Sequence, residues 1–322
     1  MTAPRLPTPI ALGGALAIGA MTAIQARING VLGVRIDDGI LAGLISFTVG
    51  LVVLLMTVPM LPSGRAALTR LAHGVRGRTI PPWMLLGGAC GALTVSTQGL
   101  TAGLLGVALF TVGVVAGQTV NGLLLDRIGF GPSGVVAVTV GRVVGGALAL
   151  VAVGISLGGE VLAAAPLWML SLPFLAGVGI AWQQAANGRL SQRVGSPVVA
   201  TTVSFTTGTI VLLIAVGIGF ALGKTPAQLP TEPWLYLGGL LGMAYIFLGA
   251  WLVAHTGVLL LGLGSVLGQL IAAVVIDLLW PPAAGPALWQ LIAMVLVGVA
   301  AVLVALIRPP RRRPSASSAA SD

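Results

Sequence analysis

The sequence predicts an all-α polytopic membrane protein with ten transmembrane helices, arranged as two inverted five-helix repeats with both termini in the cytoplasm. Three observations lead to this prediction: a very apolar composition, ten apolar stretches of spanning length and an internal repeat. Of the 322 residues, 57% are hydrophobic and 7% are charged, whereas a soluble domain carries about 25% charged residues. The mean hydropathy is +1.07. A soluble enzyme and a disordered chain are therefore excluded.

Apolar stretches of about 20 residues, long enough to cross a hydrocarbon core, follow one another along the chain. Clusters such as Pro62-Ser63-Gly64 and Gly131-Pro132-Ser133 separate several of them and indicate turns. The connections at 101–103 and 254–256 are much tighter. The predicted spans are 9–31, 39–61, 82–101, 103–125, 134–157, 166–190, 197–222, 233–254, 256–279 and 286–307.

Arginines are distributed unequally between the two sides of this topology. With the N-terminus inside, one face keeps mainly Arg35 and Lys224. The cytoplasmic segments collect Arg5, Arg65, Arg70, Arg76, Arg78, Arg127, Arg189, Arg193 and the tail arginines Arg308, Arg311, Arg312 and Arg313. The positive-inside rule therefore places both termini in the cytoplasm. The net charge of +9 sets topology, and the near absence of aromatic residues among these charges argues against nucleic-acid binding.

An internal repeat relates the two halves of the chain. The motif Q-x3-N-G-x-L begins at Gln25 and again at Gln183, and S-F-T-x-G begins at Ser46 and again at Ser204. The aligned stretches are 25–35 with 183–193, 46–50 with 204–208 and, after a small deletion, 82–126 with 233–277. Unusual residues at fixed offsets across several helices are strong evidence of duplication.

Each repeat holds five predicted helices, and because five is odd the second copy enters the membrane from the opposite side. Inverted repeats of this kind are a known plan of secondary transporters, in which the solute site lies at the repeat interface. The predicted domains are 1–161 for the first repeat, 162–310 for the second, and a disordered basic and Ser/Ala-rich tail at 311–322.

The motifs also carry a family resemblance. A five-helix unit with Q-x3-N-G-x-L at 25–32, S-F-x-x-G at 46–50 and G-x6-G-x3-G-Q-x7-D at 106–126 resembles the YdcZ family of the drug/metabolite transporter superfamily. The resemblance covers nearly all of residues 9–307, as a fused two-unit member. It implies an EamA-like fold in the bacterial inner membrane and export of small metabolites or drugs, and it supplies no particular substrate.

Polar side chains within predicted spans are the candidate solute ligands, because they are costly in lipid without partners. Gln25 and Asn29 share one helix face, and Gln183 and Asn187 repeat the pair, with Gln184 on its flank. Amides donate and accept, so they suit a neutral or zwitterionic solute. Buried amides also bond packed helices together, and both interpretations stay open for the glutamines. For the two asparagines, helix-end capping is favoured.

A second set of candidates follows glycine pairs. Gln118 and Gln269 each come directly after glycines with G-x-x-x-G spacing, which lets helix backbones approach closely. We expect Gly113, Gly117, Gly264 and Gly268 to form packing or hinge seams. The third helix is unusually polar at Thr94, Ser96, Thr97 and Gln98, and its counterpart carries Tyr245, so these residues are further candidates for a cavity lining.

Charged residues inside the spans are few. The first helix has Gln25 and no carboxylate, which argues against proton-coupled export of large cations. Arg27 is expected to reach the membrane interface, with an anionic solute as the alternative partner. Asp126 and Asp277 end equivalent helices. For both, capping a connection or pairing with a neighbouring arginine is favoured over a role in gating or proton transfer.

The sequence lacks the chemical groups that a disulfide framework, a metal site or an enzyme would need. Cys90 is the only cysteine, so a disulfide framework or a thiolate metal site is excluded within one chain. The two histidines, His73 and His255, are far apart and form no H-E-x-x-H motif. We therefore expect no enzyme, no cofactor and no metal. A channel or a non-transporting membrane partner is the alternative, and an intramembrane enzyme is less favoured. A monomer and a homodimer are both compatible with the sequence.

Overall fold

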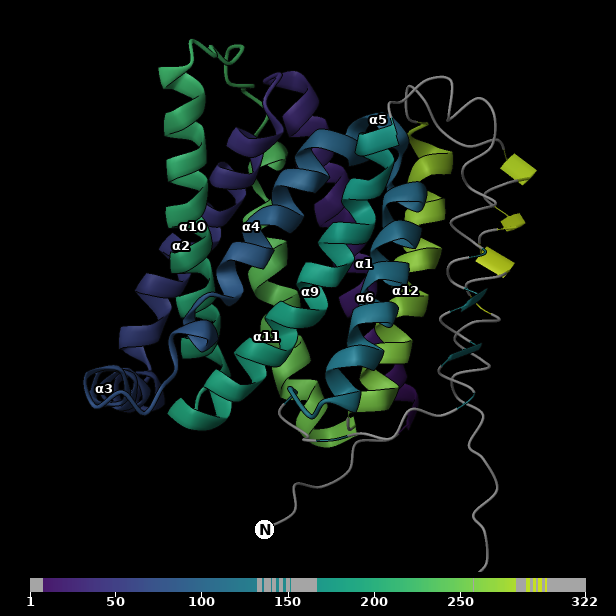
Figure 1. Ribbon diagram of the computed structural model, residues 1–322. Coiled ribbons are helices and arrows are strands. Elements are labelled where there is room, and N and C mark those ends of the chain that lie inside the picture. The colour runs from purple at the N-terminus through teal and green to yellow at the C-terminus, as the bar shows by residue number, and fades with distance from the viewer. Residues whose placement is uncertain are drawn as a thin grey trace, which may run out of the picture.

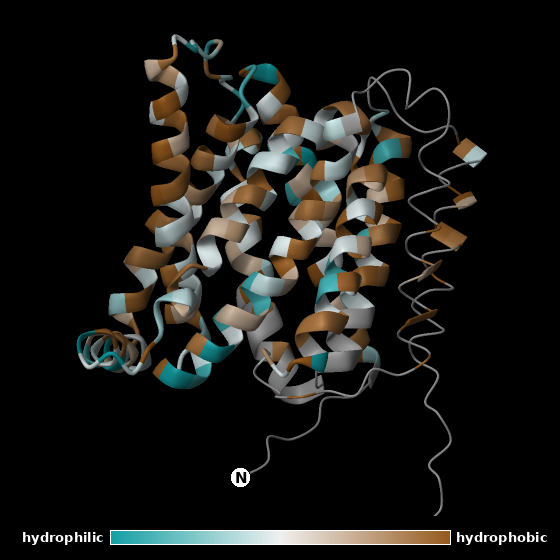
Figure 2. Ribbon diagram, in the orientation of Figure 1, coloured by the Kyte–Doolittle hydropathy of each residue, from teal (hydrophilic) through white to brown (hydrophobic). Residues whose placement is uncertain are grey.

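The computed structural model describes residues 8–131, 167–256 and 258–281, with short pieces between 135 and 151 and between 288 and 299. All regular structure in these residues is helical. Most of the helices run side by side in one bundle (Figure 1). Apolar residues cover much of their length, and the largest polar areas lie at the helix ends (Figure 2).

The first half of the chain begins with a helical hairpin. Its helices are α1 (Thr8–Arg35) and α2 (Gly39–Met60), and α3 (Pro62–Arg76) follows after one residue. The next segment is composite: η1 (Pro82–Leu85), α4 (Gly87–Thr97), the π-helical turn η2 (Gln98–Ala102) and α5 (Gly103–Leu105). The described part of this half ends with α6 (Val107–Arg127).

The second half repeats part of this order, without counterparts of α3, η2 and α5 in its described residues. It contains α9 (Leu167–Val194), α10 (Pro197–Ala221), η3 (Pro233–Tyr236), α11 (Gly238–Thr256) and α12 (Val258–Leu279). Side chains at equivalent positions cap the second helix of each half: Asp38 accepts from the backbone N–H of Ile40 and Leu41, and Ser196 accepts from that of Val199. The predicted spans 134–157 and 286–307 lie largely outside the described residues. So does Arg142, which is expected to anchor the cytoplasmic end of the fifth span at the membrane interface.

Four described stretches are long and apolar enough to cross a membrane: Leu12–Arg35, Gly39–Met60, Val107–Leu125 and Pro197–Ala221. A shorter apolar stretch covers Gly264–Leu279. The structure therefore agrees with the all-α membrane class that the composition predicts.

Several predicted boundaries were wrong. The turn expected at Pro62-Ser63-Gly64 is the start of α3, because proline is tolerated in the first turn of a helix. The connection expected at 101–103 lies at Gly106, whose φ of 90° favours glycine. The helices α1 and α9 continue to Arg35 and Val194, beyond the predicted ends at 31 and 190. Hydropathy marks where a stretch stops being apolar, whereas backbone geometry decides where the helix stops.

The helices of the two halves are interleaved. α1 packs against α11 and α12 of the second half, and α9 packs against α4 and α6 of the first. α2 packs against α10, where the rings of Phe47 and Phe205 stack with centroids 4.7 Å apart. The main buried apolar cluster combines residues of α1, α6, α9 and α12, including Phe110 and Leu270. The core is consequently shared by both halves.

Glycines mark the closest contacts between the halves. At Gly113 and Gly117 of α6 the space for a Cβ is taken by α9, and at Gly264 and Gly268 of α12 it is taken by α1. A methyl group on Gly113, for example, would lie 2.7 Å from the Cβ of Pro173. Because contact distances this short leave no room for a side chain, the backbones of α6 and α9, and of α12 and α1, can lie against each other only through glycine.

Candidate solute site

The first amide pair links α1 to both halves of the bundle. Gln25 donates from Nε2 to the carbonyl oxygen of Gly238 on α11, at 2.9 Å. Asn29, one turn later, donates from Nδ2 to Oε1 of Gln98 in the π-helical turn, at 2.7 Å. Gln25, Asn29 and Gln98 are all buried. The remaining amide oxygen of Asn29 lies against Gly238 and has no hydrogen-bond partner.

The second amide pair sits on α9 in a related setting. Gln183 donates from Nε2 to the hydroxyl oxygen of Ser204 on α10, at 3.0 Å. A methyl group on Gly91 of α4 would lie 2.6 Å from this same nitrogen. Asn187 presents its Oδ1 to Gly87 at an equal distance from the Cβ position, 2.6 Å, and that oxygen is buried without a partner. Glycines of α4 thus make room for the amides of α9.

The surroundings of the two pairs correspond, but their hydrogen bonds differ. In the sequence alignment, the glycines of α11 that face Gln25 and Asn29 match those of α4 that face the second pair. Ser46 matches Ser204, yet its hydroxyl oxygen is buried with no hydrogen-bond partner. Gln98 is matched by Gly249, which has no side chain to bond. The first half therefore holds a polar link that the second half lacks.

The favoured interpretation of the asparagines as helix-end caps was wrong. Asn29 and Asn187 lie inside α1 and α9, because these helices run on to Arg35 and Val194. An asparagine inside a helix has its backbone groups paired within that helix, so its side chain is free to contact a neighbour. Here the neighbours are Gln98 for Asn29 and Gly87 for Asn187.

The other predicted ligands do not join either amide pair. Gln269 is buried on α12 and its Nε2 has no hydrogen-bond partner. Gln118 on α6 and Tyr245 on α11 are half-buried, and Gln184 on α9 is exposed. Within the described parts of the chain, no side-chain hydrogen bond connects these four residues to Gln25, Asn29, Gln183 or Asn187.

The polar third helix is largely satisfied by its own backbone. Thr94 donates to the carbonyl of Cys90 at 3.0 Å, and Thr101 donates to that of Thr97 at 2.7 Å. A hydroxyl group bonded in this way is satisfied by the backbone of its own helix and does not indicate a solute site. Gln98 is the exception, because it reaches across to Asn29.

Asp277 joins the halves at the start of α6. Its two carboxylate oxygens accept from the backbone N–H of Val107 at 2.9 Å and of Ala108 at 2.7 Å. The carboxylate is buried at the positive end of the α6 dipole, and Arg27 of α1 interacts with it electrostatically. This agrees with the favoured capping role. The matching side chain, Asp126, lies outside the described residues.

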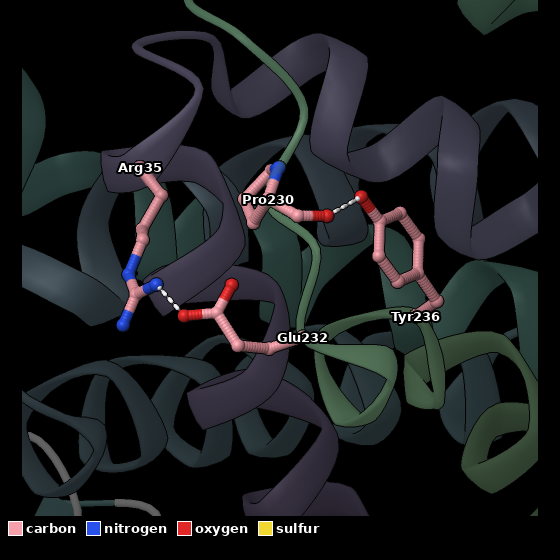
Figure 3. A network of polar contacts seen from close by, with 4 residues as sticks. All are labelled: Arg35, Pro230, Glu232 and Tyr236. Carbon is pink, nitrogen blue, oxygen red and sulfur yellow. Dashed lines mark hydrogen bonds and ion pairs between the residues drawn. The ribbon is translucent and has the colours of Figure 1, made fainter.

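An arginine lies at the end of α1 and another lies at the end of α9. Each contacts a segment of the other half, just before η3 or η1. Arg35 pairs with Glu232, just before η3 (Figure 3). The matching Arg193 donates to the carbonyl of Thr79, just before η1, at 2.8 Å. The hydrogen bond from Arg35 is the main cause that lowers the pKa of the Glu232 carboxyl, which is exposed to solvent.

Further contacts hold the end of the bundle where Arg35 lies, called here the Arg35 end. Lys224 and Asp38 form an ion pair at 3.1 Å, and the backbone N–H of Ala227 donates to Ile36 at 3.0 Å. The Tyr236 hydroxyl donates to the carbonyl of Pro230 at 2.6 Å (Figure 3). Residues 222–232 are thereby fixed across the turn between α1 and α2.

Arginines also hold together the opposite end of the bundle, where α3 lies, called here the α3 end. Arg70 of α3 donates to the last carbonyl of α9, that of Val194, at 2.6 Å. Arg189 donates to the carbonyl of Phe130 at 2.9 Å, and the Phe130 ring packs on Trp83 with centroids 4.6 Å apart. No group of three or more His, Cys, Asp or Glu residues is close enough to hold a metal ion in the part of the chain that the structure describes.

Several polar residues that make these contacts were not singled out as solute ligands by the sequence patterns. Ser46 and Ser204 appeared only as part of a repeated motif, although their repetition with Gln25 and Gln183 was an available signal. Gln98 was a candidate for a cavity lining only as one of a group of polar neighbours, and no sequence pattern singled out Glu232. Their contacts depend on how the halves interleave, and no single-helix pattern contains that arrangement.

These features define a polytopic helical membrane protein whose buried polar groups lie between two sequence-matched halves. Comparison with known families makes the assignment specific. The chain matches the family described as "Putative inner membrane exporter, YdcZ" over residues 10–156 and 168–303, and it belongs to this family. No curated protein matches the chain. The protein is therefore a multi-pass transporter of the inner membrane, as the sequence resemblance implied.

Proposed function

We propose that this protein is a secondary exporter that moves a small neutral or zwitterionic solute by alternating access between two inverted five-helix repeats. The repeats are residues 1–161 and 162–310, and the moving units are 9–157 and 166–307. The two family matches, 10–156 and 168–303, support the duplication. The interface between the repeats would hold the solute, as in other inverted-repeat transporters.

The observation that carries the proposal is the interleaving of the halves at the amide pairs. Gln25 bonds α11 of the second half, and Gln183 fits against Gly91 of the first. A movement of one repeat against the other must therefore change the surroundings of both glutamines. The glycine seams favour such sliding, because no side chain interlocks there.

Among the described residues, six buried side-chain polar atoms have no hydrogen-bond partner, and four of the six support an amide-type solute. Oδ1 of Asn29, Oδ1 of Asn187, Oγ of Ser46 and Nε2 of Gln269 have no hydrogen-bond partner, and leaving such groups unpaired is costly. Acceptors and a donor without net charge fit a neutral or zwitterionic solute better than a cation. Gln118, Gln184 and Tyr245 complete the proposed set as contacts made in other conformations of the cycle.

The end contacts supply a gate on each side. In this proposal the ion pair of Arg35 with Glu232 holds one end closed, and the hydrogen bond from Arg193 to the carbonyl of Thr79 holds the other. Each contact joins the first helix of one repeat to the third helix segment of the other, so rocking of the repeats would break one while preserving its counterpart.

The distribution of charges supports an orientation with both termini in the cytoplasm. At the α3 end, Arg70, Arg189 and Arg193 bond to backbone carbonyls. The two cations of the Arg35 end, Arg35 and Lys224, are each paired with a carboxylate. Uncompensated arginine at the α3 end is what the positive-inside rule expects of the cytoplasmic side.

A ligand screen followed by solute counterflow tests the proposal. The purified protein is heated with a metabolite and drug panel, and a ligand at 100 times its Kd should raise stability by about 2.7 kcal/mol. Each hit is then measured for saturable counterflow in proteoliposomes. We expect both signals to fall in Gln25→Ala and Gln183→Ala, and to persist in Thr57→Ala, whose exposed hydroxyl bonds only its own helix.

The outcomes separate the function classes. Flux that does not saturate and shows no counterflow would identify a channel, and a covalently altered solute would identify an enzyme. Saturable counterflow that is unchanged in both glutamine variants would preserve the transporter and reject the proposed site. A panel of chemically diverse solutes that produces neither binding nor flux favours a non-transporting membrane partner.

A further inference from the structure

The helix α3 differs from the other long helices in direction and in charge. In Figure 1 it is seen almost along its axis, so it lies across the end of the bundle. It starts at Pro62, one residue after α2 ends at Met60, so α3 begins where α2 leaves the apolar region. This places α3 at the level of the lipid headgroups.

One stripe of α3 packs against the bundle. Gly64, Ala67 and Gly74 are buried and Leu71 is half-buried, a spacing that puts all four on one face. The buried cluster beneath them includes Val58 and residues of α9 and α10. The helix is therefore anchored on one side and exposed on the other.

The exposed side of α3 carries positive charge with no acidic residue nearby in sequence. Arg65 and Arg76 are separated by about three helical turns and so lie along one line, and Arg78 follows the helix. All three are exposed. Residues 39–125 contain no Asp or Glu. Arg65 donates one hydrogen bond to Pro59.

Two of these guanidinium groups have no partner among the residues that the structure describes. Neither Arg76 nor Arg78 forms a hydrogen bond or an ion pair with any residue that the structure describes. At the other end of the bundle, by contrast, Arg35 and Lys224 are both neutralised by carboxylates. The unpaired arginines at the end of α3 and just after it are thus a local feature, not a property of all the cations in the chain.

Exposed apolar side chains lie beside these charges. Met60 is 78% exposed and Val75 is 44% exposed. Arginine next to apolar surface is the combination by which an interfacial helix contacts the boundary between headgroups and acyl chains. A guanidinium group also binds phosphate oxygens in a fixed, two-pronged geometry.

We propose that the exposed face of α3, formed by Arg65, Arg76 and Arg78, binds the phosphate headgroups of anionic phospholipids. The surface potential of an anionic membrane attracts each exposed arginine. Binding would hold α3 against the bilayer and would thereby secure the end of α2 and the adjoining end of α9. This role is separate from solute transport and does not depend on it.

The test measures lipid affinity of the full chain in neutral detergent. The unfolding temperature is followed against phosphatidylglycerol concentration, with phosphatidylcholine of the same acyl chains in parallel. We expect the wild-type protein to prefer phosphatidylglycerol. Arg76→Gln with Arg78→Gln removes no side-chain hydrogen bond or ion pair to the described residues, so it should fold normally, and it should weaken this preference by about fivefold for each arginine.

Two control variants test whether the lipid binds at α3 and not at another group of cations. Arg35→Gln with Lys224→Gln removes two cations from the opposite end and should leave phosphatidylglycerol affinity unchanged. Arg311→Gln with Arg312→Gln tests the basic tail in the same way. An unchanged affinity in the Arg76/Arg78 variant, or an equal loss in either control, would overturn the proposal. Inorganic phosphate that stabilises the protein as well as phosphatidylglycerol does would also reject a lipid surface.

Discussion

Asp277 offers the sharpest test of how the two halves are joined. Its carboxylate accepts from the backbone N–H groups of Val107 and Ala108 at 2.9 and 2.7 Å. Asp277→Ala would leave both donors buried without a partner, at about 1–3 kcal/mol each, and would remove a charge worth about 0.3–1 kcal/mol at a helix N-terminus. We expect a loss of about 3 kcal/mol in the free energy of unfolding, or somewhat more, since Arg27 loses its nearby carboxylate.

Asp277→Asn separates capping from proton transfer. The amide keeps one acceptor oxygen and loses the charge, so we expect a loss of about 1–2 kcal/mol. Equilibrium unfolding in mixed detergent micelles measures both variants, and Asp37→Asn is the control because Asp37 is exposed and asparagine tolerates its positive φ of 52°. If neither Asp277 variant were destabilised relative to that control while solute flux vanished, the capping account would be refuted in favour of a proton carrier.

Three further predictions follow from the packing, the polar link and the gate. Gly117→Ala should destabilise the protein by about 2 kcal/mol or more because α9 occupies the Cβ position. Gly122→Ala on the same helix has open space and should be neutral or slightly stabilising in the same unfolding assay. A double-mutant cycle of Asn29→Ala with Gln98→Ala should give a coupling of about 0.6–1.7 kcal/mol, and no coupling would mean that the bond adds nothing. The hydrogen bond from Arg35 lowers the pKa of Glu232 in the folded protein below its ordinary value of 4.5. Glu232 therefore contributes to stability above pH 4.5, and this contribution is lost as the pH falls through the lower pKa of the folded protein. Glu232→Gln should remove this acid-dependent part of the unfolding curve.

The sequence predicted the elements better than it predicted their contacts. Glycine at Gly113 and Gly117 pointed to a tight helix contact, and the structure places α9 there. The helix α3 was not expected, because Pro62-Ser63-Gly64 resembles a turn and the short arginine-rich stretch after it has little apolar length. Its apolar stripe, with Ala67, Leu71 and Val75 at helical spacing among arginines, was a signal present in the sequence and was missed.

The contacts of the polar residues were harder to foresee for a physical reason. Periodicity shows that Gln25 and Asn29 share a face, but it does not show which helix lies opposite. That depends on the interleaving of the halves, which puts α11 beside Gln25 and the π-helical turn with Gln98 beside Asn29. A break from α-helical to π-helical geometry is a property of the folded backbone and had no sequence signal.

Alternating access is tested most directly by locking one end of the bundle and probing the other. In a Cys90→Ala background, the pair Arg35→Cys with Glu232→Cys is joined by a short bifunctional thiol reagent with a cleavable disulfide. In the same protein, with Lys224→Arg, the variant Thr79→Lys reports accessibility at the α3 end through an amine-reactive label that does not react with thiols, and the unlinked protein is the control.

We expect the cross-link to stop solute counterflow and to raise the labelling rate at position 79, and we expect both effects to be reversed when the reagent is cleaved. Continued counterflow with the Arg35 end locked, or labelling at position 79 that does not respond to the lock, would contradict rocking of two repeats around a shared site.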